Sequence, residues 1–130
     1  MDRLNAWAPR VLSVLRIVAG LLYMQHGAMK ILHFPEGMPG GEALPPLIML
    51  AGWMELVGGG LLALGLFTRP VAFLLSGQMA VAYFMAHASQ GFYPIMNKGE
   101  LAVLYCFVFF YFVFAGAGPW SLDAVVRKRT

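Results

Sequence analysis

The chain has little charge, and this shortage excludes an ordinary soluble domain. Charged residues make up 12% of the 130 residues, whereas 60% are hydrophobic and the mean hydropathy is +0.72. A soluble domain of this length has one core and needs a polar exterior to cover it, which so few charged side chains cannot supply. The composition therefore indicates a protein whose solvent is lipid.

Cysteine is almost absent as well, and the histidines are poorly spaced for a metal. Cys106 is the single cysteine, which excludes an intrachain disulfide, a CxxC redox pair and a thiolate metal site. Its aromatic and methionine-rich surroundings are typical of a small core residue. His26, His33 and His87 lack the paired i, i+4 spacing of familiar metal-binding helices, so the sequence predicts no metal site.

Acidic residues are few, and the resulting net charge of +3 does not indicate a nucleic-acid partner. A basic protein that follows a phosphate backbone gathers its cations on one surface. Here they stand at the ends of apolar runs, which is how charges set topology in a membrane. The residues that show this are Arg3, Arg10, Arg69, Arg127, Lys128 and Arg129.

Long apolar runs are abundant. A helix that crosses a bilayer needs about 20 apolar residues, and the segments 11–32, 46–67, 71–89 and 101–118 come close to that length. The sequence therefore predicts one all-α domain over residues 1–130, an integral membrane four-helix bundle. Such a chain is a multi-pass protein of the cell membrane, in bacteria the inner membrane.

The connections predict how the helices are joined. Residues 33–46, HFPEGMPGGEALPP, carry four prolines and three glycines and are expected to form an ordered or re-entrant loop. Thr68, Arg69 and Pro70 are so short a link that the flanking helices must form an antiparallel hairpin. With four crossings, most cations lie on the face that carries both termini, so the positive-inside rule predicts that both termini are cytoplasmic.

Polar residues follow one side of the first helix. Gly20, Tyr23, Gly27 and Lys30 follow Arg16 at spacings of 4, 7, 11 and 14, which places all five on one helical stripe. An ionisable side chain inside a membrane is costly and is expected to face the bundle. The first helix therefore turns a polar, small-residue face inward.

A carboxylate near the middle of the second helix needs a partner. Glu55 lies between Gly52 and Gly59 on one side of the helix, where small residues allow a neighbouring helix to approach closely. Arg16 is the leading candidate partner, because its long side chain reaches toward the midplane. The pair would either fix the register of the helices or form part of a site that holds a proton or a substrate.

Other polar groups converge on the non-cytoplasmic half. His26 and Lys30 lie in the outer half of the first helix, and Asn97 and Glu100 open the fourth helix at the same level, where Lys30 and Glu100 could pair. Tyr111 follows Glu100 at a spacing of 11, within an aromatic wall. This wall either contacts neighbouring helices and lipid or lies against a planar ligand such as a quinone.

The order of these features is similar to that of the DoxX family of small four-helix membrane proteins. The resemblance rests on RIVAGLLYMQHGAMKI in the first helix, GWMELVGGGLLALGLFTRP in the second, and NKGE at the start of the fourth. The family pattern carries over to Arg16, Gly27, Lys30, Glu55, Gly59, Gly65, Arg69, Asn97 and Glu100. The resemblance implies a link with thiosulfate or thiol oxidation coupled to membrane quinone, together with membrane or soluble redox partner proteins.

Three functions fit these observations. In the first, an accessory subunit of a quinone-linked oxidoreductase binds quinone or a small oxyanion in an outward-facing polar pocket. In the second, the charged pairs only lock the bundle, and the protein is a non-enzymatic assembly or interaction module. In the third, the chain is a small transporter that works as a homodimer. The candidate ligand-binding residues are Arg16, His26, Lys30, Glu55, Asn97, Glu100 and Tyr111.

Overall fold

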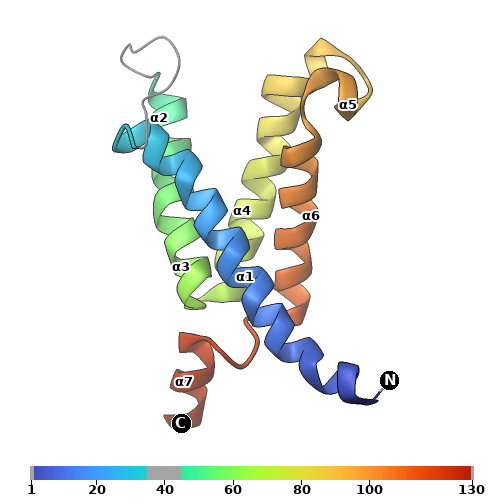
Figure 1. Cartoon of the computed structure of the whole chain (residues 1–130). Helices are drawn as coiled ribbons and strands as arrows, with labels where there is room; N and C mark the ends of the chain where they lie inside the picture. Colours follow the sequence, from blue (N-terminus) through green and yellow to red (C-terminus); the bar gives the residue numbers. More distant parts are fainter. Residues whose placement is uncertain (1, 35–44, 130) are drawn as a thin grey trace. The chain divides into compact units, whose positions relative to one another are not determined.

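The computed structural model describes residues 2–34 and 45–129, and all regular elements within these ranges are helical (Figure 1). They are α1 (Asp2–Ile31), α2 (Pro46–Trp53), η1 (Met54–Gly58), α3 (Gly59–Leu64), α4 (Thr68–Ala82), η2 (Tyr83–His87), η3 (Ala88–Gln90), α5 (Pro94–Asn97), α6 (Glu100–Ala115) and α7 (Leu122–Arg129). Of these, η1 and η2 are π-helical segments and η3 is a 3₁₀ turn. The predicted all-α class is confirmed. Most of the loop predicted over 33–46 lies outside the described residues.

Three helical stretches in the described part of the chain are long and apolar enough to cross a membrane. They run over Asp2–Ile31, Pro46–Leu64 and Thr68–Gln90. The fourth apolar helix, α6, has 16 residues. At 1.5 Å per residue it is about 24 Å long, somewhat less than the roughly 30 Å of a hydrocarbon core. The four-helix bundle and the cytoplasmic termini remain predictions.

The first helix is longer than expected. It begins at Asp2, well before the predicted start at Val11, and Pro9 lies inside it. Pro9 is the eighth residue of α1, beyond the first four residues whose N–H groups lack an intrahelical acceptor, so it costs the helix one hydrogen bond, and the helix continues through it. Residues 2–10 thus continue the first span as helix.

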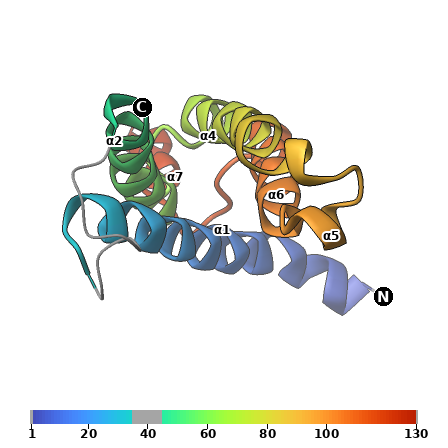
Figure 2. The ribbon, with the colours of Figure 1, turned by 90° about the horizontal axis from the view of Figure 1, so that it is seen from above.

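The chain forms two compact units, of which the first contains residues 1–68 and 117–130. Within it α1 packs along the second span, which runs from α2 through η1 to α3, as the view in Figure 2 shows for α1 and α2. A Cβ atom added at Gly20 would stand 2.6 Å from the backbone nitrogen of Ala63, and one added at Gly27 would collide with the nitrogen of Leu56. The two backbones therefore meet directly, which only glycine permits.

The second unit contains residues 69–116. In it α4 and α6 lie side by side, and the Ser76 hydroxyl donates a hydrogen bond of 2.8 Å to the carbonyl oxygen of Cys106 (Figures 1 and 2). At the far end of α6 the chain turns at Gly116, whose φ of +80° suits glycine. Helix α6 consequently ends just before Gly116, short of the predicted boundary at Gly118.

Candidate functional site

Arg16 is enclosed by backbone carbonyl groups. Its side chain is fully buried, and Nε donates to Leu62 O at 2.9 Å. Nη2 donates to Ala63 O at 3.4 Å and to Trp120 O at 2.7 Å, while Nη1 donates to Ala117 O. Leu62 and Ala63 belong to the last turn of α3, where carbonyl groups have no intrahelical donor and the helix dipole is negative. The guanidinium group therefore serves as a clamp between α1, α3 and the C-terminal segment.

This clamp overturns the predicted pairing of Arg16 with Glu55. Arg16 faces the end of α3, whereas Glu55 belongs to η1 and lies beside the C-terminal part of α1. Arg16 and Lys30 are 14 residues apart, or about 21 Å along the helix. An arginine side chain cannot cover that distance, so the register between the two spans assigns Glu55 to a different cation.

Lys30 is that cation. Its Nζ forms an ion pair with the Glu55 carboxylate and donates to both oxygens, the Oε2 distance being 2.7 Å. Glu55 is 2% exposed and Lys30 18%. Lys30 was also a candidate partner of Glu100, but the structure commits it to Glu55. Side chains on a helix lean toward its N-terminus, which brings Lys30 back along α1 to the level of Glu55.

The Glu55 carboxylate stands on an irregular piece of helix. Residues 54–58 form a π-helical turn inside the second span, between α2 and α3. Such turns are rare and occur frequently at functional sites, because the extra residue changes where the neighbouring side chains point. The sequence carried no signal for this turn, since its residues are ordinary helix formers apart from Gly58.

His26 adjoins the ion pair. It lies one helical turn before Lys30, its side chain is exposed, and it interacts electrostatically with both Glu55 and Lys30. Its ring centroid is 6.4 Å from that of Tyr23, which is 1% exposed. The first unit thus brings together three of the predicted site residues: a buried carboxylate, an ammonium group and an accessible imidazole.

The other predicted residues lie in the second unit. Asn97 is fully buried; its amide nitrogen donates to Tyr83 Oη at 3.1 Å and to Gly91 O at 2.9 Å, and its oxygen accepts from Gly99 N at 2.8 Å. Glu100 is exposed in the first turn of α6, and Tyr111 is 57% exposed. The structure therefore holds Asn97 in a loop network and leaves Glu100 and Tyr111 on the surface of their unit.

Asp123 is a residue that the sequence analysis missed. Its carboxylate accepts hydrogen bonds from the backbone nitrogens of Phe67 (2.9 Å) and Thr68 (3.0 Å), and its own N–H donates to Gly65 O at 2.9 Å. Burial acts to raise the pKa of Asp123, but the bonds from Thr68 and Phe67 and the charge of Arg127 together lower it below its ordinary value. The sequence does place an acidic residue in the first turn of a short C-terminal helix. It does not indicate that the partners of this residue lie more than 50 residues earlier in the chain.

No group of three His, Cys, Asp or Glu side chains in residues 2–34 and 45–129 could hold a metal ion. The side chains around Glu55 can supply hydrogen bonds, charge and exchangeable protons.

Proteins of similar sequence are found in bacteria. The chain is 49% identical over 134 residues to an uncharacterized protein of Haemophilus influenzae, covering 99% of this chain and 100% of that one. It is 27% identical over 145 residues to an uncharacterized membrane protein of Mycobacterium tuberculosis, covering 97% of this chain and 87% of that one. No solved structure matches the chain significantly.

A family comparison agrees with the resemblance seen in the motifs. The model of the DoxX family matches residues 11–88, which include Arg16 and its carbonyl partners in α3, the Lys30–Glu55 pair and the turn that carries Glu55. The matched range ends before Asn97 and Glu100. The chain belongs to the DoxX family of membrane proteins.

Proposed function

We propose that this protein is a redox-associated membrane subunit that binds a quinone in a polar site formed by Glu55, Lys30 and His26. The observation that carries the proposal is a carboxylate 2% exposed, paired with an ammonium group on a π-helical turn and adjoined by an exposed imidazole. A pair that only fixed register would not need a titratable group beside it that is open to the surroundings. Groups of this kind in a spanning segment are expected to be functional.

The charges favour a neutral ligand over an oxyanion. Glu55 and Lys30 neutralise each other, so a small anion would gain little net attraction from the pair. A quinone is uncharged and offers two carbonyl acceptors. Two of the three Lys30 donors bond to Glu55, and the third would serve a ligand carbonyl beside His26.

The structure narrows the residues that we propose for this site. Arg16 donates to four carbonyl groups, and both donors of the Asn97 amide are used within its loop, so we now assign these two residues to scaffolding. Glu100 and Tyr111 are exposed on the second unit, and the site that we propose does not use them. We also retain the proposed outward-facing opening, the single domain over residues 1–130 and the redox partner proteins.

The second candidate function is an assembly or interaction module. It is favoured by the direct contact of the α1 backbone with Ala63 and Leu56, which by itself specifies the packing of the two spans. In that case the Lys30–Glu55 pair contributes only to stability. A transporter acting as a homodimer is the third candidate, for which the structure adds no observation.

The test is to purify the protein in mild detergent and to quantify bound quinone by mass spectrometry for the wild type, Glu55→Gln, His26→Ala and the matched control Glu100→Gln. Loss of one hydrogen bond to a charged group, about 1.4 kcal/mol or more, corresponds to a roughly tenfold loss of affinity. We expect that loss for Glu55→Gln and His26→Ala, and unchanged quinone content for Glu100→Gln. Wild-type protein without quinone, or equal content in all four proteins, would support the assembly module.

A further inference from the structure

The loop between η3 and α6 exposes four large apolar side chains that the proposed site does not use. Phe92 is 86% exposed, Tyr93 65%, Ile95 74% and Met96 74%. We call these four residues the loop shelf. Side chains exposed to this degree in a short segment mark an interaction surface.

The loop shelf is held in place by buried polar groups. Asn97 cross-links the loop through Tyr83 Oη, Gly91 O and Gly99 N, and His87 Nδ1 lies 3.1 Å from the carbonyl oxygen of Asn97. A Cβ atom added at Gly99 would stand 2.6 Å from the Tyr83 ring, so the loop closes tightly on η2. The buried Asn97 amide therefore holds the turn in one conformation, and this turn exposes the apolar side chains.

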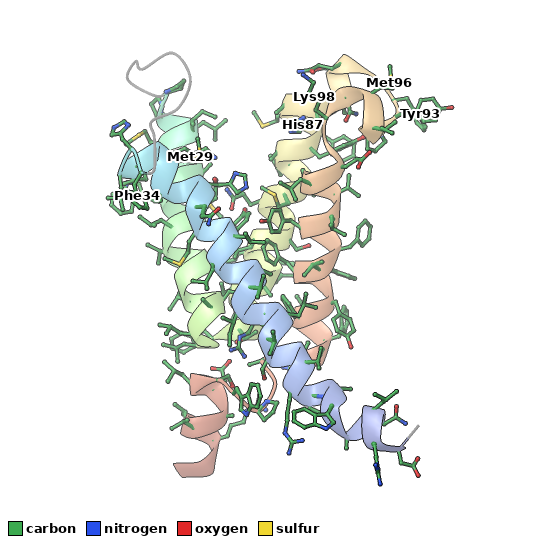
Figure 3. All side chains as sticks on the ribbon, viewed as in Figure 1. Met29, Phe34, His87, Tyr93, Met96 and Lys98 are labelled. Atoms are coloured by element: carbon green, nitrogen blue, oxygen red, sulfur yellow. The ribbon has the colours of Figure 1, made fainter. Side chains whose placement is uncertain are left out.

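The direction in which the side chains of the loop shelf project indicates what covers them. Figure 3 shows Tyr93 projecting sideways from the α4–α6 pair, with Met96 on the same side of the loop, whereas Lys98 lies on the other side, close to His87. A side chain that projects sideways at the end of two apolar helices meets the headgroup region of a bilayer.

The shelf is also continuous with surface that faces lipid in a membrane protein. Directly after the loop, Leu101 and Leu104 of α6 are 50% and 62% exposed. Before it, Phe84 and Met85 of η2 are 71% and 59% exposed. Tyr93 adds a phenol hydroxyl to an apolar ring, the combination enriched where hydrocarbon meets water. The chain has no Asp or Glu between Glu55 and Glu100, so no carboxylate within the loop repels lipid phosphate.

We infer that the loop shelf is a phospholipid anchor: Phe92, Tyr93, Ile95 and Met96 insert into the boundary between headgroups and acyl chains, and Asn97 is the lock that orients them. Helix α6 is short for a full crossing, and the anchor sets the depth at which it begins. Lys98 remains at the phosphate level. This role is independent of quinone binding.

The test places a fluorescent label at two neighbouring positions of the full chain. Met96→Cys and the matched control Lys98→Cys are made in a Cys106→Ala background, labelled with bimane, and reconstituted into vesicles of phosphatidylcholine and phosphatidylglycerol. Lipids brominated on their acyl chains report insertion, and iodide in the buffer reports exposure to water. Apolar faces at interfaces lie about 5–10 Å below the headgroups, so we expect bromolipid to quench position 96 about threefold more than position 98, and iodide to do the reverse.

Equal quenching of the two positions by iodide, with no effect of bromolipid at position 96, would overturn the inference. So would a label at position 96 that is shielded from both quenchers, because a second copy of the chain would then cover the shelf. A label shielded only in native membranes would indicate a protein partner instead. Asn97→Ala, with helix content followed by circular dichroism, should bring the bromolipid quenching at position 96 down toward that at position 98.

Discussion

The two units of the chain bury different kinds of polar group. The first unit buries charges, with Arg16 fully enclosed and Glu55 2% exposed. The second unit buries neutral groups, chiefly Asn97 and Ser76, and leaves Arg69, Lys98 and Glu100 exposed. A buried charge depends on a partner of matching geometry, while a buried amide needs only hydrogen bonds. We therefore expect protonation and charge substitutions to change the stability of the first unit more than that of the second. The first unit also holds the proposed site.

The largest expected loss of stability comes from replacing Arg16, and Arg69 is its comparison because both arginines donate to carbonyl groups. Arg16→Ala removes a buried guanidinium group that donates to four carbonyl groups of α3 and the C-terminal segment, and it should lower the free energy of unfolding by about 3–5 kcal/mol. Arg69 donates to Val113 O and Phe114 O from an exposed position, so Arg69→Ala should cost about 1 kcal/mol or less. Unfolding in mixed detergent micelles measures both. Similar costs for the two substitutions would remove the distinction between the units.

The two glutamates give the next comparison. Glu55→Gln leaves the partly buried Lys30 ammonium without its counter-charge and should lower the free energy of unfolding by about 2–4 kcal/mol, whereas Glu100→Gln on the surface of α6 should lower it by less than about 0.5 kcal/mol. A thermal melt in detergent measures each. Replacing both members of the pair, Lys30→Leu with Glu55→Leu, should restore most of the stability. A double variant that melts as early as Glu55→Gln would mean that the loss of stability in Glu55→Gln does not arise from the unpaired charge.

The smallest effect concerns Asp123 and pH. Its folded-state pKa is lowered, so its contribution to stability is present above its unfolded pKa, about 4, and is lost as pH falls through the folded value. Asp123→Asn removes a carboxylate that caps the start of α4 and should cost about 1 kcal/mol at neutral pH. Melts of both proteins from pH 7 to pH 3 measure the difference. It should shrink on acidification, and a difference that grows would contradict the lowered pKa.

Much of the first unit was predictable because its features are local. The stripe from Arg16 to Lys30 follows from helical periodicity, and the close approach of the spans follows from glycines at regular spacing. The link predicted over residues 68–70 instead belongs to the first turn of α4, and the antiparallel hairpin stays a prediction. The partner of Glu55 was predicted wrongly, because two cations share one stripe and only the register between α1 and the second span decides which of them meets the carboxylate.

The candidate site was less accessible to prediction. Its π-helical turn changes the direction of Glu55 without any unusual residue at that point. Asp123 and Asn97 hold chain segments through backbone partners, and any residue supplies a backbone N–H or C=O. The residue types in the sequence therefore do not reveal these contacts, which are seen only in the three-dimensional structure.

The sequence by itself determined that this is a helical membrane protein of the DoxX family, since apolar length, charge position and motif order are properties of the linear chain. Tertiary structure alone decided that Arg16 clamps carbonyl groups, that Lys30 meets Glu55 beside His26, and that Asp123 ties the C-terminal helix to the start of α4. The physical reason is distance: ion pairs and hydrogen bonds act over a few ångströms, and the register that brings their partners within reach arises from helix packing.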